Sequence, residues 1–226
     1  MKKLIPAEPP EWDAAIDAIV KDDLRSFTQL LKKNPELAQA GSVQEFFIKP
    51  IARQIYKGDT LLHVAAAGYR VEISGLLLKN GARVNAANRR GAQPLHYAAV
   101  GARDAKQQEK ILALLVRAGA NPDARDKGGV TPLHRAVRTR SSVAVKQLLK
   151  LGASLRSKNE ELGSTPLHLA VQTTGASGSG SKQARVEQME IIRILLAAGA
   201  KPSDKNKAGK TVLASTKDKE CLKLLV

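Results

Sequence analysis

One tetrapeptide pattern recurs along this chain and restricts what the chain can fold into. It reads Thr-Leu-Leu-His at residues 60–63, Gln-Pro-Leu-His at 93–96, and Thr-Pro-Leu-His at 131–134 and 165–168. All four histidines of the chain occupy its last position, at intervals of 33, 38 and 34 residues. A degenerate copy, Thr-Val-Leu-Ala, follows at residues 211–214. Self-similarity at this period indicates a chain built from one small unit that repeats.

Each copy carries the signals of a short helix followed by a longer one. A glycine stands two residues before every copy, and a Leu-Leu pair and then Gly-Ala follow the first four. Threonine is a good N-cap, and proline suits the first helical position because its missing N–H would have no partner there. The glycine of Gly-Ala suits the left-handed end of the second helix. One such unit cannot bury its apolar face alone, so the units must stack.

This pattern resembles the ankyrin repeat, whose hallmark is Thr-Pro-Leu-His-x-Ala. The resemblance covers residues 56–226 and implies an all-α ankyrin-repeat solenoid of stacked helix-turn-helix units joined by β-hairpin-like loops. About six repeats are expected, including atypical caps. The expected parts are an N-terminal helical capping repeat (1–40), an atypical connector with no assigned element (41–57), four repeats (58–207) and a truncated C-terminal capping repeat (208–226).

Two insertions interrupt the period, near residues 101–107 and 173–187. Both fall between the Leu-His motif and the Leu-Leu pair, so we expect them between the two helices of a repeat. The second contains the run Thr-Gly-Ala-Ser-Gly-Ser-Gly-Ser at 174–181, a composition typical of flexible linkers. The insertions therefore decorate one edge of the stack without breaking it.

The net charge of +16 is concentrated in the middle of the chain. Residues 51–158 hold 20 Lys and Arg against 6 Asp and Glu, whereas residues 1–50 hold 7 against 8. Three interpretations remain open. The cations only solvate the repeats, they attract an acidic protein surface, or they bind the phosphates of a nucleic acid. Few aromatic residues lie among them to stack on bases, which disfavours the third.

The resemblance implies that a partner binds the hairpin tips and the adjacent first-helix surface on the concave side. Lys57, Arg89, Arg90, Lys127 and Arg138 form the predicted basic strip. The complete set of predicted partner contacts is Tyr56, Lys57, Asp59, Arg89, Arg90, Val100, Lys127, Val130, Arg135, Arg138, Leu162, Lys207 and Lys210. We expect a non-catalytic module that binds another, possibly acidic, protein; the alternative is a binder of nucleic acid or another polyanion.

No catalytic residue, metal ligand or cofactor is predicted. The histidines recur one to a repeat, so they lie too far apart to share an ion, and the family resemblance gives them a structural role. Gly209-Lys210-Thr211 lacks the earlier glycine of a phosphate-binding loop, where Asp204 stands instead. The single cysteine, Cys221, is expected to be a buried apolar residue. No membrane span or signal peptide is predicted, so we expect a cytoplasmic monomer.

Overall fold

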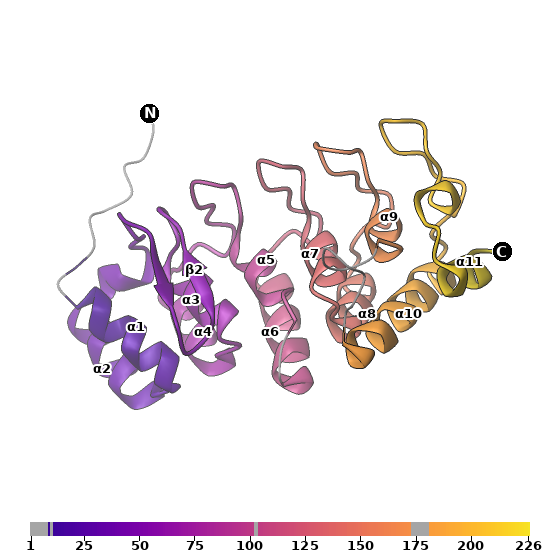
Figure 1. Ribbon diagram of the computed structural model, residues 1–226. Helices are drawn as coiled ribbons and strands as arrows, with labels where there is room; N and C mark the ends of the chain where they lie inside the picture. The colour runs from indigo at the N-terminus through magenta and orange to yellow at the C-terminus, as the bar shows by residue number, and fades with distance from the viewer. Residues whose placement is uncertain (1–8, 10, 102–103, 173–180) are drawn as a thin grey trace. The chain divides into compact units, whose positions relative to one another are not determined.

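The computed structural model describes residues 9, 11–101, 104–172 and 181–226. Figure 1 shows its helices and strands along the chain. The chain groups into two compact units. Unit 1 comprises residues 1–98 and 104–121, and unit 2 comprises residues 99–103 and 122–226. The division falls inside the predicted 58–207 repeat series.

Unit 1 begins with the predicted helix pair. Helix α1 runs from Trp12 to Lys21 and helix α2 from Leu24 to Lys33, followed by the short 3-10 helix η1 (Pro35–Ala38). The two helices pack against each other through buried apolar side chains that include Trp12, Ile19 and Phe27. Asp23 caps α2, because its carboxylate accepts from the backbone N–H of Ser26 at 2.9 Å.

Two stacked helix pairs complete the helical part of unit 1. They are α3 (Leu61–Ala67) with α4 (Val71–Lys79), and α5 (Pro94–Ala98) with α6 (Ala105–Arg117). Helix α3 packs on α5 and α4 packs on α6, so neighbouring repeats bury their equivalent helices against each other. The Leu-Leu-His-Val-Ala-Ala-Ala sequence of α3 permits this, since its small side chains allow close approach and all seven residues are buried.

The connector at residues 41–57 contains a β-hairpin. Strand β1 (Phe46–Ile48) pairs antiparallel with strand β2 (Arg53–Ile55), and Phe47 stands opposite Gln54. Ile48 and Ile55 are buried. At the hairpin turn, Ile51 packs close to Gly68, where a Cβ would lie 3.6 Å from the Ile51 side chain. The hairpin is therefore held against the end of α3.

Unit 2 continues the helix-pair pattern with α7 (Pro132–Arg138), α8 (Ser142–Lys150), α9 (Pro166–Ala170) and α10 (Lys182–Ala197). Helix α7 packs on α8 and α9, and α10 packs on α8, α9 and the last helix. The degenerate copy forms only the 3-10 helix η2 (Leu213–Ser215), followed by α11 (Lys219–Leu225). Cys221 of α11 is fully buried, which confirms its predicted place in the core.

The insertions lengthen the second helix of their repeats as well as the connection before it. Helices α6 and α10 have 13 and 16 residues, whereas α4 and α8 have 9 each. Asp104 and Ser181 cap the longer helices by accepting from backbone N–H groups three residues on. The expectation that these insertions lie wholly between the helices is wrong for residues 105–107 and 182–187, which are helical. Residues 102–103 and most of the predicted Gly/Ser linker, at 173–180, lie outside the described residues.

Candidate functional site

In unit 1 a backbone hydrogen bond joins the hairpin tips of two neighbouring repeats. The side-chain oxygen of Asn88 accepts from the N–H groups of Arg90 and Ala92 at 2.9 and 3.0 Å, which closes a tight turn. The N–H of Arg89 donates to the carbonyl of Lys57 at 2.8 Å. This bond places the Lys57 turn beside the Arg89–Arg90 turn.

The side chains of these turns form one cluster, which we call the basic tip: Tyr56, Lys57, Arg89 and Arg90. The guanidinium carbons of Arg89 and Arg90 lie 5.8 and 5.0 Å from the centre of the Tyr56 ring, within the range of cation–π attraction. Arg90 also donates to the Tyr56 hydroxyl at 3.2 Å. Arg89 pairs with Glu45, whereas Lys57 and Arg90 present exposed side chains. The structure thus brings four of the predicted contact residues together on a positively charged surface.

The fifth predicted contact in this region, Asp59, is not on the surface. Its side chain is fully buried and accepts from the Tyr97 hydroxyl at 2.6 Å, from the Asn88 amide at 2.9 Å and from the Tyr56 N–H at 2.7 Å. His63 lies 3.7 Å from the same carboxylate. The prediction of Asp59 as a partner contact is therefore wrong, because three donors from within unit 1 enclose it.

The predicted first-helix surface is also closed in unit 1. Every residue of α3 is buried, and the β1–β2 hairpin packs at its end. The residue after the motif histidine is buried in both repeats, as Val64 in α3 and Tyr97 in α5. Both first helices of unit 1, α3 and α5, are therefore buried along their whole length.

In unit 2 one of the predicted contact residues forms an ion pair with a turn residue of the fold, and the others are exposed or half-buried. Arg135 donates to Asp126 at 2.9 Å, and the same aspartate accepts from the N–H groups of Gly128 and Val130 to close the turn. Arg135 is thus an internal partner of a turn residue. Lys127, Arg138, Leu162, Lys207 and Lys210 are exposed, and Val100 and Val130 are half-buried.

The tips of unit 2 carry paired charges. Arg125 pairs with Glu160 at 2.6 Å, and the Lys207 ammonium donates to the backbone carbonyl of Glu160. Lys158 likewise donates to the carbonyl of Lys205 at 2.8 Å. One ion pair and two lysine–carbonyl hydrogen bonds therefore link neighbouring tips of unit 2, and the two lysines keep their charge. The continuous basic strip through Lys127 and Arg138 stays a prediction.

The histidines are structural, as the sequence predicted. In α7, the Nδ1 atom of His134 accepts from the Thr131 N–H at 3.2 Å, so Nε2 carries the proton and donates to the Ser164 carbonyl at 3.0 Å. His63 and His168 make the same pair of contacts, with the carbonyls of Ala92 and Lys210. Each histidine therefore completes a helix cap and links it to the next hairpin. Burial lowers the pKa of all three, which keeps them neutral.

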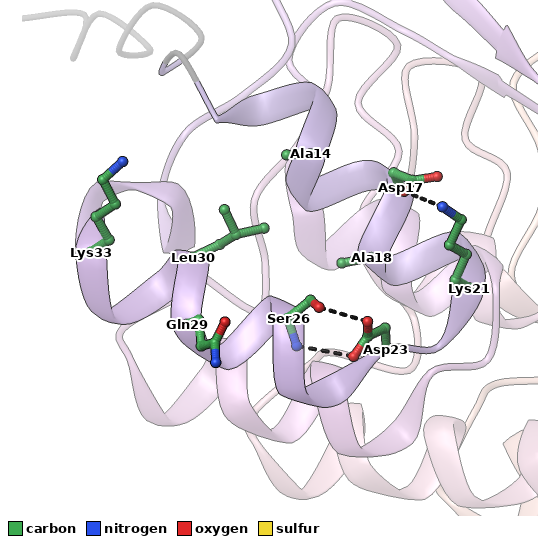
Figure 2. Close-up of a pocket in the computed structure, with 9 residues that line it drawn as sticks. All are labelled: Ala14, Asp17, Ala18, Lys21, Asp23, Ser26, Gln29, Leu30 and Lys33. Carbon is green, nitrogen blue, oxygen red and sulfur yellow. Dashed lines mark hydrogen bonds and ion pairs between the residues drawn. The ribbon is translucent and has the colours of Figure 1, made fainter.

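A separate groove of about 540 Å³ lies on the exposed side of α1 and α2 (Figure 2). Its charged groups are engaged locally, with Asp17 paired to Lys21 at 2.6 Å and Asp23 bonded to the Ser26 N–H and hydroxyl. Lys33 pairs with Glu11 at 3.2 Å. Asp23 is the N-cap of α2, and the ion pairs Asp17–Lys21 and Lys33–Glu11 lie on the surface, so these groups stabilise the two helices.

Two other kinds of feature, a metal centre and a membrane-spanning helix, are absent from the described residues. No group of three or more His, Cys, Asp or Glu side chains there is arranged to hold a metal ion. None of the described helices combines the length and the apolar character needed to cross a membrane. The Lys207–Lys210 segment is a repeat tip, since Asn206 accepts from the N–H groups of Ala208 and Lys210 as Asn88 does in unit 1.

The stacked helix pairs, threonine–histidine caps and hairpin tips define a helical repeat protein. Comparison with known families agrees. A family model described as ankyrin repeats (3 copies) matches residues 15–126 and 102–180, and a model of the single ankyrin repeat matches residues 162–207. The chain belongs to the ankyrin-repeat family. No curated protein matches it.

The family match includes residues that the sequence motif did not mark. It begins at residue 15, inside α1, and so takes in the N-terminal helix pair and the β1–β2 hairpin. Glu45, which precedes β1 and pairs with Arg89 of the basic tip, and Phe47 of β1 are not among the predicted contacts. One signal was available, because Phe46-Phe47 is a pair of rings in a chain with only three phenylalanines.

Proposed function

We propose that this chain is a non-catalytic interaction module that binds an acidic surface of another protein through the basic tip of unit 1. Ankyrin repeats are generally protein–protein interaction modules, and members of the family are typically non-catalytic. One observation carries the proposal: Arg89 and Arg90 are held over the Tyr56 ring, with Lys57 beside them.

This arrangement favours binding because the cations are ordered before a partner arrives. Fixing a free arginine side chain opposes association through lost side-chain entropy. Contact with the Tyr56 ring and hydroxyl removes part of that cost for Arg90. Tyrosine and arginine are also the residue types that contribute most at protein interfaces. Complementary charge adds faster association and selects against basic partners.

The test is affinity capture from the native source with the full chain as bait, compared with two charge-reversed variants. One carries Arg89→Glu and Arg90→Glu; the other carries Lys146→Glu and Lys150→Glu on α8, where both lysines are exposed. Both changes alter the net charge equally. We expect the wild-type and α8 baits to retain one protein at a stoichiometric amount and the tip variant to lose it. If all three baits retain the protein equally, the basic tip is not the binding surface.

A further inference from the structure

The β1–β2 hairpin has one buried and one exposed face. Side chains alternate between faces along a strand, and residues that stand opposite each other share a face. Ile48 and Ile55 are buried and point toward the fold. Phe47 and its partner Gln54 therefore point the other way, and Phe47 is 55% exposed.

The exposed face runs on into the basic tip. Because the alternation repeats every two residues, Glu45 lies on the same face as Phe47, and Tyr56 lies on the same face as Gln54. Arg89 supplies an independent check, because it donates to Glu45 at 3.0 Å and its guanidinium also lies 5.8 Å from the Tyr56 ring centre. Glu45 and Tyr56 hence lie side by side. We call the surface formed by Glu45, Phe47, Gln54 and Tyr56 the hairpin face.

Phe47 differs from an ordinary exposed apolar residue in its surroundings. Single apolar side chains on a surface need no explanation. Phe47, however, lies on a hairpin whose other face is fixed to the fold, and the paired strand β2 leads directly to Tyr56 of the basic tip. Protein interfaces commonly have an aromatic centre surrounded by a charged rim. Phe47, on its rigid hairpin beside ordered cations, has this composition.

We propose that the hairpin face and the basic tip together recognise an acidic segment that carries a large apolar side chain. The apolar side chain packs on Phe47, and the carboxylates of the segment meet Arg90 and Lys57. Arg89 serves less directly, since Glu45 already pairs with it. This inference rests on the proposed function and adds to it the chemistry of the bound segment.

Single-stranded nucleic acid fits this surface less well. Strand binding depends on several rings on which successive bases stack. On the hairpin face the Tyr56 ring is already engaged by two guanidinium groups, which leaves Phe47 as the one ring there open to a base. A carboxylate-bearing segment with one apolar anchor uses all the groups present.

The experiment compares two polymeric probes of equal carboxylate concentration, poly-L-glutamate and a random copolymer of L-glutamate and L-tyrosine, each labelled with a fluorophore. Their binding to the full chain is measured by fluorescence anisotropy at low and moderate salt. We expect the copolymer to bind about threefold to tenfold more tightly than poly-L-glutamate. Phe47→Ser should abolish this difference and leave the affinity for poly-L-glutamate unchanged, whereas Phe47→Leu should keep most of it.

Val186→Ser on α10 is the matched control, since Val186 is also 55% exposed, and it should change neither affinity. Circular dichroism checks that each variant is folded. Equal affinity of the wild type for both polymers overturns the inference about the apolar side chain and leaves the proposed function standing. Failure of the wild type to bind either polymer at low salt overturns both. The inference is also overturned if the wild type binds a single-stranded oligothymidylate more tightly than the copolymer and Phe47→Ser loses that binding. This result would assign the surface to nucleic acid.

Discussion

The hydroxyl of Tyr97 donates a 2.6 Å hydrogen bond to the carboxylate of Asp59, which lies 38 positions earlier in the chain and is fully buried. The Asn88 amide donates both to this carboxylate, at 2.9 Å, and to the Tyr97 hydroxyl, at 3.0 Å. The His63 ring meets the Tyr97 ring edge-on at 5.2 Å. A closed polar network thus fixes the first motif repeat to the second directly beneath the basic tip.

Removing the Tyr97 hydroxyl should weaken this junction. Tyr97→Phe keeps the ring and leaves the buried carboxylate with one donor fewer, so we expect the free energy of unfolding to fall by about 1–3 kcal/mol. Urea unfolding followed by circular dichroism measures the change. Tyr56→Phe is the matched control, because Tyr56 is partly exposed and its hydroxyl accepts from the exposed Arg90 side chain; its effect should stay within about 0.5 kcal/mol. Equal stability of Tyr97→Phe and the wild type would contradict the network.

Arg70 should hold the end of the first helix. Its guanidinium donates to the carbonyls of Ile19 and Val20, in the last turn of α1, at 2.9 and 2.6 Å. Carbonyls at a helix end have no partner within the helix, and charged donors are among the strongest caps. Arg70→Ala should lower the free energy of unfolding by about 1.5–3 kcal/mol and speed hydrogen exchange in α1. Arg83→Ala, which removes an exposed arginine, should do neither; equal effects of the two would refute the cap.

The neutral histidines should make stability depend on pH. Burial lowers the pKa of His63, His134 and His168 in the folded chain, so the unfolded chain binds more protons near the ordinary histidine pKa. The free energy of unfolding should therefore decrease as the pH falls from about 7.5 to about 5.5, which spans the usual value near 6.5. Asp218, whose pKa the Arg185 hydrogen bond lowers to about 2, stays ionised over this range. Urea unfolding at the two pH values should show a smaller decrease in His134→Gln, and a pH-independent wild type would contradict the assignment.

Two glycines with positive φ should respond differently to alanine. Gly163, at φ +63°, lies in a tip, and a Cβ there would stand 2.9 Å from the backbone nitrogen of Lys207. Gly152, at φ +94°, ends α8, and no described atom lies within 4 Å of its added Cβ. Gly152→Ala should cost about 1 kcal/mol for the left-handed backbone alone, and Gly163→Ala at least about 1 kcal/mol more for the crowding. Urea unfolding that gave equal losses would argue against close contact between these tips.

The repeats could be read from the sequence because their signals are local. The threonine caps, the motif histidines and the helix-ending glycines each act within a few residues, and the structure confirms the helices they predict. The β1–β2 hairpin could not be read, since Phe46-Phe47-Ile48 is too short to show strand alternation and its support comes from Gly68 in the next helix pair.

The candidate site shows the same limit. Arg89 and Arg90 were recognisable as tip residues from their place in the repeat. The burial of Asp59 was not, because it depends on Tyr97, which lies 38 positions later in the chain. The ion pair between Glu45 and Arg89 joins residues 44 positions apart and leaves no local signal. The helical insertion residues 182–187 could have been predicted, since Ser181 is a good cap and no glycine or proline occurs from Lys182 to Ala198.

Site-specific photo-crosslinking tests the central claim most directly, because it asks which surface the partner touches. Benzoylphenylalanine replaces Lys57 in the basic tip or, as the control, the exposed Lys79 of α4, and each chain is irradiated in extract of the native source. The account predicts one discrete protein adduct from position 57, little from position 79, and loss of the first when Arg89→Glu and Arg90→Glu are added. Adducts of equal yield from both positions, or an adduct at position 57 that survives the charge reversal, would contradict it.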